Sequence, residues 1–261
     1  MLDGRRGTGD RARVTASPSV ALVALALLVF CTGSLSLACN PSQDSARKPS
    51  SLVPAPRTDE WAVAREKECI RRARESAPAR LVFVGDSITQ SWEDPGKAAW
   101  DAHLAPLGAV NLGNSGDRTE HVLHRLAEAP LTRLEPEHVF ILIGTNNLGH
   151  GSSNAAETLA GVRAVAETIA AQCPEAAVHI IEIFPRGEAF NAMRGDILQI
   201  NQALRAWVAA QRNPRLSIHA IGDAFVSSDG TISKDLMPDA LHLTPKAYGM
   251  WAEAVLRIVA G

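Results

Sequence analysis

The sequence predicts an α/β fold, a three-layer α/β/α sandwich around a central parallel sheet of about five strands. From residue 59 onward, short apolar runs alternate with longer segments of helical period, which is the pattern of repeated strand–helix–strand units. Each run is brief and bounded by Gly, Pro or polar residues, as expected for parallel strands buried on both faces. The predicted strands are 81–84, 109–112, 139–143, 178–184 and 216–221.

Apolar residues spaced three and four apart predict the helices that cover this sheet. A third helix is predicted at the C-terminus, where Thr244 is the expected N-cap and Pro245 fits the first helical position. We interpret these apolar stripes as core, not as binding sites. The stripes of the first two helices are Leu159, Val162, Val165 and Ile169, then Ile197, Ile200, Leu204 and Val208.

Composition favours one catalytic domain with extra sequence at one end. The chain has 261 residues, 46% of them hydrophobic, which suffices for one α/β domain with a full core. Lys and Arg number 26 against 28 Asp and Glu, so the net charge is -2. Such a balance gives no broad attraction to nucleic acid or to an anionic membrane, and no nucleic-acid partner is expected.

Residues 1–38 are predicted to be an export signal. Four arginines between residues 5 and 13 form a basic region, the run 20–30 is continuously apolar, and small residues lead up to Ala38 and Cys39. The apolar run is short for a transmembrane span, so cleavage is favoured over an uncleaved anchor.

Residues 35–39 resemble a bacterial lipobox, in which the cysteine thiol carries a diacylglyceryl group. Ser36 stands where that pattern prefers Leu. Lipidation of Cys39 is favoured over an ordinary secreted start. We therefore expect a protein of the cell envelope, lipid-anchored through Cys39 or secreted to the periplasm, that touches a membrane only through this anchor.

Residues 39–58 are predicted to be a disordered tether, and residues 59–261 the catalytic domain. The tether is rich in Ser, Pro and charge and has no apolar period. Of the four cysteines, Cys69 and Cys173 fall in the domain. Their spacing matches no metal motif, and two isolated buried thiols are favoured over a disulfide.

Polar groups follow three of the predicted strands at the points where the strands end. Asp86 and Ser87 come after the first strand, Gly113 after the second, and Thr145 with Asn146 after the third. Ligands of such sheets bind outside the carboxyl ends of the strands. A hydroxyl, a glycine amide and a side-chain amide are the parts that acyl transfer needs, namely a nucleophile and donors to a developing oxyanion.

The segment 239–242 supplies the base. It places Asp239 three residues ahead of His242, just before the last predicted helix. In a tight turn the carboxylate can accept a hydrogen bond from one ring nitrogen and direct the other toward Ser87. Ser87 is therefore the predicted nucleophile, with His242 as base and Asp239 as its orienting acid.

These four blocks resemble the GDSL or SGNH hydrolases, whose motifs centre on Ser, Gly, Asn and His in that order. The resemblance places Ser87 on the nucleophile and Asp239 and His242 on the acid and base. It places Gly113 and Asn146 on the oxyanion hole, together with the Ser87 backbone amide. It further implies a flavodoxin-like strand order, 2-1-3-4-5, and no cofactor or metal.

Further stretches resemble the subfamily of platelet-activating-factor acetylhydrolase type Ib catalytic subunits. This resemblance implies that Ile88, Thr145 and Leu241, beside the catalytic residues, crowd the acyl pocket and favour acetyl. It also allows a homodimer. An exported protein, however, meets other substrates than those subunits do. The similar stretches are 85–92, 111–126, 144–150, 184–187 and 225–243.

Polar residues near the site receive structural or solvent roles. Asp86 and Asn147 are expected to bond backbone groups and hold the site loops. His121 and His124, three apart on a predicted helix, are expected to be solvated because no third metal ligand has suitable spacing. Solvated charge is likewise favoured for three arginines that could otherwise reach a head group, namely Arg118, Arg186 and Arg194.

The predicted function is an exported serine esterase that hydrolyses short-chain, acetyl-type oxygen esters of a small lipid or sugar through an acyl-serine. Alternatives are a carbohydrate O-acetylesterase and a lysophospholipase or lipase. A non-catalytic cell-surface binding module is disfavoured, because the chain keeps Ser87, Asn146, Asp239 and His242.

Overall fold

A sheet of five parallel strands lies at the centre of the computed structural model, which describes residues 48–76 and 78–261. Its strand order is β2-β1-β3-β4-β5, as the family resemblance implies. The register pairs Gly85 with Gly113 on one side and with Leu142 on the other, so β1, β2 and β3 end at the same level. The strands are β1 (Leu81–Gly85), β2 (Ala109–Gly113), β3 (His138–Leu142), β4 (Ala177–Ile181) and β5 (Leu216–His219).

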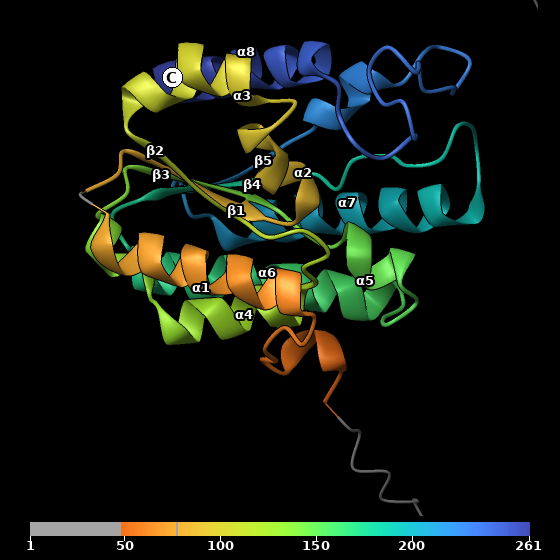
Figure 1. Cartoon of the computed structure of the whole chain (residues 1–261). Helices are drawn as coiled ribbons and strands as arrows, with labels where there is room; N and C mark the ends of the chain where they lie inside the picture. The colour runs from red at the N-terminus through yellow and green to blue at the C-terminus, as the bar shows by residue number, and fades with distance from the viewer. Residues whose placement is uncertain (1–47, 77) are drawn as a thin grey trace, which may run out of the picture. The chain divides into compact units, whose positions relative to one another are not determined.

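Helices cover both faces of the sheet, which gives the predicted three layers (Figure 1). The final helix, α8 (Pro245–Ala260), covers one face together with the short α3 (Lys97–Ala99). Thr244 is its N-cap, as predicted. The opposite face is covered by α1 (Glu60–Glu75), α4 (Thr119–Glu128), α6 (Ala155–Gln172) and α7 (Ala192–Gln211).

Shorter helices lie at the strand ends and in the connections. Two of them, α2 (Ser87–Gln90) and α5 (Thr145–Gly149), begin within two or three residues of the ends of β1 and β3. The helical turns are η1 (Ser50–Leu52), η2 (Ser91–Glu93), η3 (Trp100–Leu104), η4 (Ala105–Leu107), η5 (Leu131–Leu134) and η6 (Ile221–Phe225).

Alternate residues of β1 divide the core into two halves. Val82 and Val84 of β1 face the core under α1, α4, α6 and α7, whereas Leu81 and Phe83 face the core under α8. Phe83 packs against four aromatic rings of its half, with ring centroids 4.9–6.5 Å apart. A strand with apolar residues on both sides is the physical reason for the continuous apolar runs in the sequence.

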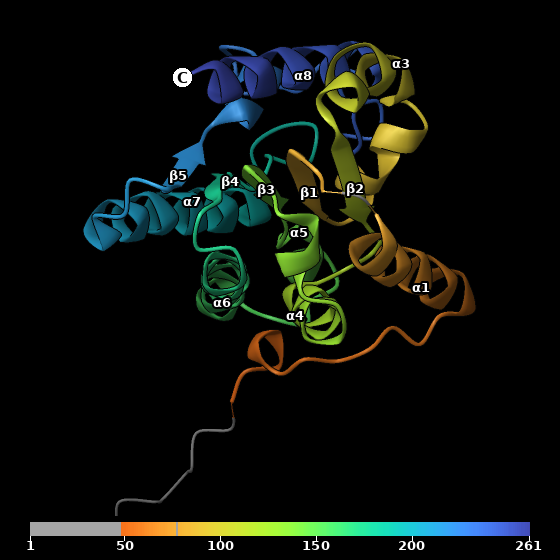
Figure 2. The same cartoon turned by 90° about the vertical axis from the view of Figure 1, so that its left-hand side faces the viewer.

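Part of the predicted tether is packed onto the domain. We call residues 48–58 the strap; in Figure 2 it runs from η1 past α4 to the start of α1. Ser51 is buried, its hydroxyl donates to the Glu157 carbonyl (2.7 Å), and its carbonyl accepts from Thr119 Oγ1 (3.0 Å). The expectation of disorder fails here because tertiary hydrogen bonds, not apolar periodicity, hold the strap.

Two other expectations concern cysteines and membranes. Cys69 and Cys173 are free and buried, as predicted. Cys39 and the predicted export signal lie outside the described residues. In the part of the chain that the structure describes, no helix combines the length and apolar character needed to span a bilayer.

The two sides of α7 should respond differently to the loss of a leucine side chain. Leu204 is 0% exposed in the core, whereas Leu198 is 63% exposed on the same helix. We expect Leu204→Ala to lower the free energy of unfolding by about 2–5 kcal/mol, because it leaves a cavity. Leu198→Ala, which makes the same helix-propensity change, should cost less than about 1 kcal/mol. Urea denaturation measures both, and equal losses would contradict the assigned core.

Candidate active site

Ser87 lies on a sharp turn from β1 into α2. It is the first residue of α2, and the N-cap Asp86 accepts a hydrogen bond from the Ile88 amide through Oδ1 (3.0 Å). A Cβ at Gly85 would overlap Thr89 Oγ1 and the Leu142 carbonyl, so only glycine allows this close turn. The turn leaves the Ser87 side chain partly exposed at the end of the sheet.

A chain of hydrogen bonds links Ser87 to two side chains that precede α8. Ser87 Oγ lies 3.0 Å from His242 Nε2, and His242 Nδ1 lies 2.6 Å from Asp239 Oδ2. The other carboxylate oxygen, Oδ1, accepts from the His242 amide (2.7 Å) and the Leu241 amide (3.0 Å). The three side chains therefore stand in the order that a nucleophile, a base and an orienting acid require.

The environment of Asp239 favours its ionised form. Burial alone would raise its pKa, but the hydrogen bonds from the His242 side chain and from the His242 and Leu241 amides outweigh burial. The pKa of Asp239 is therefore held below its usual value. The loop that carries it is fastened to the β4–α7 connection, where the Gly187 amide donates to the Ala240 carbonyl (2.8 Å).

Asn146 lies in α5, after the end of β3, and is buried. Its Nδ2 donates to the Asp117 carbonyl at 3.0 Å. An asparagine amide carries two N–H groups, so this bond orients the side chain and leaves a second donor.

Gly113 has a different role from the one predicted. Its amide donates to Asn111 Oδ1 at 2.9 Å, so the hydrogen that an oxyanion would need is already used. A Cβ at Gly113 would overlap the backbone nitrogen of Gln90. The glycine is required by close packing of β2 against α2, and the structure argues against its amide as an oxyanion donor.

Gly116, three residues further on, is the glycine that sequence reasoning missed. It lies in the turn after β2 with φ +73°, a conformation that favours glycine. Within residues 48–76 and 78–261 its amide donates no hydrogen bond, and the same holds for the amide of Ser87. The signal was the Asn-Ser-Gly-Asp run at 114–117, a turn sequence whose glycine suits a positive φ.

The three residues expected in the acyl pocket have distinct surroundings. Ile88 is buried in the core under α8, and its carbonyl accepts from the Tyr248 hydroxyl (2.5 Å). Leu241 is partly buried against the same core. Thr145 is buried, and its hydroxyl accepts from Arg186 Nη1 (3.2 Å).

Asn147, beside Asn146, ties α5 to α4. Its side chain is fully buried; Oδ1 accepts from the Thr119 amide (3.0 Å) and Nδ2 donates to Glu120 Oε2 (3.2 Å). Asn147 thus fixes the place where both helices begin, beside the site.

Two polar residues expected to be solvated are buried instead. His121 is 5% exposed, and its Nδ1 accepts from the Arg118 amide (3.1 Å) at the start of α4. Burial lowers the pKa of His121 to about 4, so this ring is neutral near pH 7. Arg194 is also buried and donates to the Gly187 carbonyl (2.7 Å). Sequence could not show either burial, because the exposed fraction of a polar side chain depends on which elements the fold packs around it.

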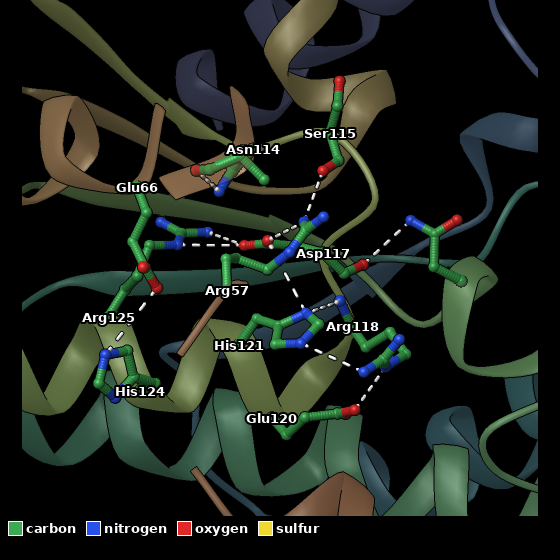
Figure 3. Close-up of polar contacts among 12 residues, drawn as sticks. Arg57, Glu66, Asn114, Ser115, Asp117, Arg118, Glu120, His121, His124 and Arg125 are labelled. Carbon is green, nitrogen blue, oxygen red and sulfur yellow. Dashed lines mark hydrogen bonds and ion pairs between the residues drawn. The ribbon is translucent and has the colours of Figure 1, made fainter. Parts of the chain in front are cut away.

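A cluster of charged side chains surrounds Asp117 (Figure 3), the residue whose carbonyl accepts from Asn146. At its centre the Asp117 carboxylate is 0% exposed and lies between two guanidinium groups. Oδ1 accepts from Arg57 Nη1 (2.9 Å), and Oδ2 accepts from Arg125 Nη2 (2.8 Å). Across residues 48–76 and 78–261, no group of three or more His, Cys, Asp and Glu side chains is arranged to hold a metal ion.

Comparison with known proteins identifies the family of the chain. Residues 83–250, well over half of the chain, match the GDSL-like Lipase/Acylhydrolase family. The chain belongs to this family. It is therefore a hydrolase of the esterase and acylhydrolase kind.

Curated relatives include subunits of one acetylhydrolase. The human platelet-activating factor acetylhydrolase IB subunit alpha1 is 32% identical over 206 residues, which cover 79% of this chain and 85% of the relative. The alpha2 subunit of Gallus gallus is 36% identical over 168 residues, covering 64% of this chain and 70% of the relative.

Solved structures share the fold. A GDSL-like lipase from Bacteroides thetaiotaomicron superposes with a TM-score of 0.62 at 20% sequence identity, covering 75% of this chain and 97% of that one. A carbohydrate esterase family 3 protein from Talaromyces cellulolyticus gives a TM-score of 0.51 at 18% identity, covering 70% and 98%.

Asp86 should make stability depend on pH. Burial raises the pKa of its carboxyl to about 7, and Oδ2 has no partner among the described residues. The pKa of Asp86 is higher in the folded state than the value of about 3.9 in the unfolded state. At pH values between the two, the folded protein therefore binds the proton more tightly. The stability that this proton confers is complete below about pH 4 and is lost as the pH rises toward and past 7.

We expect Asp86→Asn to remove this loss. Relative to the wild type, the variant should gain on the order of 2–4 kcal/mol in free energy of unfolding between pH 4 and pH 8. Urea denaturation at each pH measures the difference. The exposed Asp101→Asn should track the wild type, and a constant offset between Asp86→Asn and wild type would refute the raised pKa.

Proposed function

We propose that this protein is an exported serine esterase that hydrolyses short-chain, acetyl-type oxygen esters through an acyl-serine intermediate. The observation that carries the proposal is the continuous path from Ser87 Oγ to His242 Nε2 and from His242 Nδ1 to Asp239 Oδ2, at 3.0 and 2.6 Å. Membership of an acylhydrolase family supports the same class of reaction.

In the first half of the reaction, Ser87 Oγ attacks the ester carbonyl carbon while His242 Nε2 takes the hydroxyl proton. The tetrahedral intermediate collapses as His242 returns that proton to the departing alkoxide, and the acyl group stays on Ser87. Water then attacks the acyl-serine with His242 again as base. Collapse of the second intermediate protonates Ser87 and releases the carboxylic acid, while Asp239 stays ionised throughout.

Three donors are proposed to bind the oxyanion: the Ser87 amide, the Gly116 amide and the free N–H of Asn146 Nδ2. The two backbone amides donate to no acceptor in the part of the chain that is described. Asn146 is oriented by its bond to the Asp117 carbonyl (3.0 Å). A preorganised donor of this kind contributes about 3 kcal/mol to lowering the barrier.

Two considerations support a short acyl group. The curated relatives that match most of the chain are named as acetylhydrolases. Ile88, Thr145 and Leu241 adjoin Ser87, Asn146 and His242 in sequence. The Tyr248 hydroxyl holds the backbone carbonyl of Ile88, and Arg186 holds the Thr145 hydroxyl. Residues held beside the catalytic groups in this way are suited to limit the volume beside an acyl carbonyl.

Turnover of p-nitrophenyl acetate tests the mechanism. We expect Ser87→Ala to lower kcat by at least about 10³-fold, because the acyl-enzyme cannot form. The control is Ser228→Ala, an exposed serine whose side chain makes no hydrogen bond among the described residues, which should keep full activity. Unchanged turnover in Ser87→Ala would exclude the proposed enzyme.

The same assay, extended from acetyl to octanoyl esters, measures acyl preference, and the rate should fall as the chain lengthens. Acetylated phospholipids and acetylated sugars then identify the leaving group. Preference for the sugars would identify a carbohydrate O-acetylesterase, and preference for long acyl chains a lysophospholipase or lipase.

We further propose that Cys39 becomes the lipidated first residue of the exported protein, on the strength of residues 35–39 alone. In bacterial expression, mass spectrometry of the mature protein should find a chain that begins at Cys39 with a diacylglyceryl mass. Cys39→Ala should move the protein out of the membrane fraction. A mature N-terminus without lipid would indicate simple secretion, and an intact residue 1 an uncleaved anchor.

A further inference from the structure

We infer that Arg57, in the strap, is a positioning residue for the oxyanion hole. The inference rests on the proposed function and deepens it, because it assigns control of two oxyanion donors to a segment that precedes the catalytic domain in sequence. The inference starts from the contact of the Arg57 guanidinium with the Ser115–Gly116 peptide group.

Arg57 is buried against the turn that follows β2. Its Nη1 donates to the Ser115 carbonyl (2.7 Å) and to Asp117 Oδ1 (2.9 Å), and its Nη2 donates to Asp59 Oδ2 (3.1 Å). A Cβ at Gly116 would lie 3.2 Å from Arg57 Nη2, so the guanidinium lies directly against this glycine. Figure 3 shows Arg57 in contact with both Ser115 and Asp117.

The bond to Ser115 acts on Gly116 through the peptide plane. The Ser115 carbonyl and the Gly116 N–H belong to one planar peptide group and point in opposite directions. A guanidinium that fixes the carbonyl therefore also fixes the direction of the N–H. This bond is charge-assisted, and a hydrogen bond to a carbonyl polarises the N–H of the same peptide and strengthens it as a donor.

Arg57 also holds Asp117, the residue after Gly116, and Asp117 orients the second donor of the oxyanion hole, Asn146. The Asp117 carboxylate is bound by Arg57, and its backbone carbonyl accepts from Asn146 Nδ2 (3.0 Å). Arg57 thus secures both the peptide that carries the Gly116 amide and the residue that orients Asn146. Asp117 also has Arg125 as a partner through two nitrogens (2.8 and 3.1 Å), so neutralising Asp117 does not by itself require Arg57.

The strap delivers Arg57 to this place. Ser51 is fixed to α6 and α4 through Glu157 and Thr119, and the Ala55 amide donates to the Glu120 carbonyl (3.2 Å). These bonds carry the chain along the start of α4 to the turn at 114–117. An arginine at position 57 can therefore act on the hole only while the strap is docked.

Kinetics of the full chain test the inference. We expect Arg57→Gln to lower kcat for p-nitrophenyl acetate roughly 10- to 100-fold, as for loss of part of an oxyanion hole, with KM changed less than about threefold. Affinity for a trifluoromethyl ketone, which forms a tetrahedral oxyanion on serine, should fall by the same factor. Arg57→Lys, which keeps the charge, should lie between Arg57→Gln and wild type. Free guanidinium ion should partly restore kcat in Arg57→Ala.

The matched control is Asp59→Asn. It removes the exposed partner of Arg57 without touching Ser115 or Asp117, and kcat should stay within about twofold of wild type. Titration of active sites with a fluorophosphonate corrects every kcat for unfolded molecules.

Three results would refute the role of Arg57 or distinguish it from the esterase proposal. An unchanged kcat per active site in Arg57→Gln, or ketone affinity that does not follow kcat, would refute the role of Arg57. Loss of active sites without a change in kcat per site would show that Arg57 serves folding alone. If Ser87→Ala abolishes turnover while Arg57→Gln does not lower it, the esterase proposal stands and this inference fails.

Discussion

The register of three parallel strands is the constraint on which the site depends. Gly85 of β1 is paired with Gly113 of β2 and with Leu142 of β3, so three chain segments leave the sheet at one level. Parallel strands can meet in this way only because helical crossovers return the chain to the same end of the sheet each time. Ser87, the 114–117 turn and Asn146 follow from that shared end point, and packing of α8 brings the Asp239–His242 loop to them.

Close approach of backbone to backbone makes the arrangement possible. At Gly85 and Gly113 a Cβ would overlap atoms of α2 or β3, so α2 lies nearer the sheet than any other residue would allow. The N-terminus of α2 is consequently held at the sheet edge, and its first amide donates to no acceptor among the described residues. In the proposed mechanism, the serine hydroxyl and a donor for the oxyanion thus come from one residue.

Buried charge forms the second support of the site. The Asp117 carboxylate, with a guanidinium on each side, joins the strap, the turn after β2 and α4 in one cluster. Breaking a buried ion pair leaves an uncompensated charge and is strongly unfavourable, so such a cluster holds its members in one arrangement. The cluster adjoins Asn146 and Gly116, where a shift of a few tenths of an ångström would alter hydrogen bonds to a reacting oxygen.

Apolar periodicity in the sequence by itself determined the layers, because that pattern is local, and the family resemblance implied the strand order. Residue type and position along the chain marked Ser87, Asp239 and His242 as the candidate catalytic residues. The sequence did not determine which glycine presents a free amide. Gly113 and Gly116 look alike in the sequence, and only the side chain of Asn111, folded back onto the Gly113 amide, separates them. The order of the strap was also decided by tertiary structure, since a polar segment becomes ordered only when distant groups complete its hydrogen bonds.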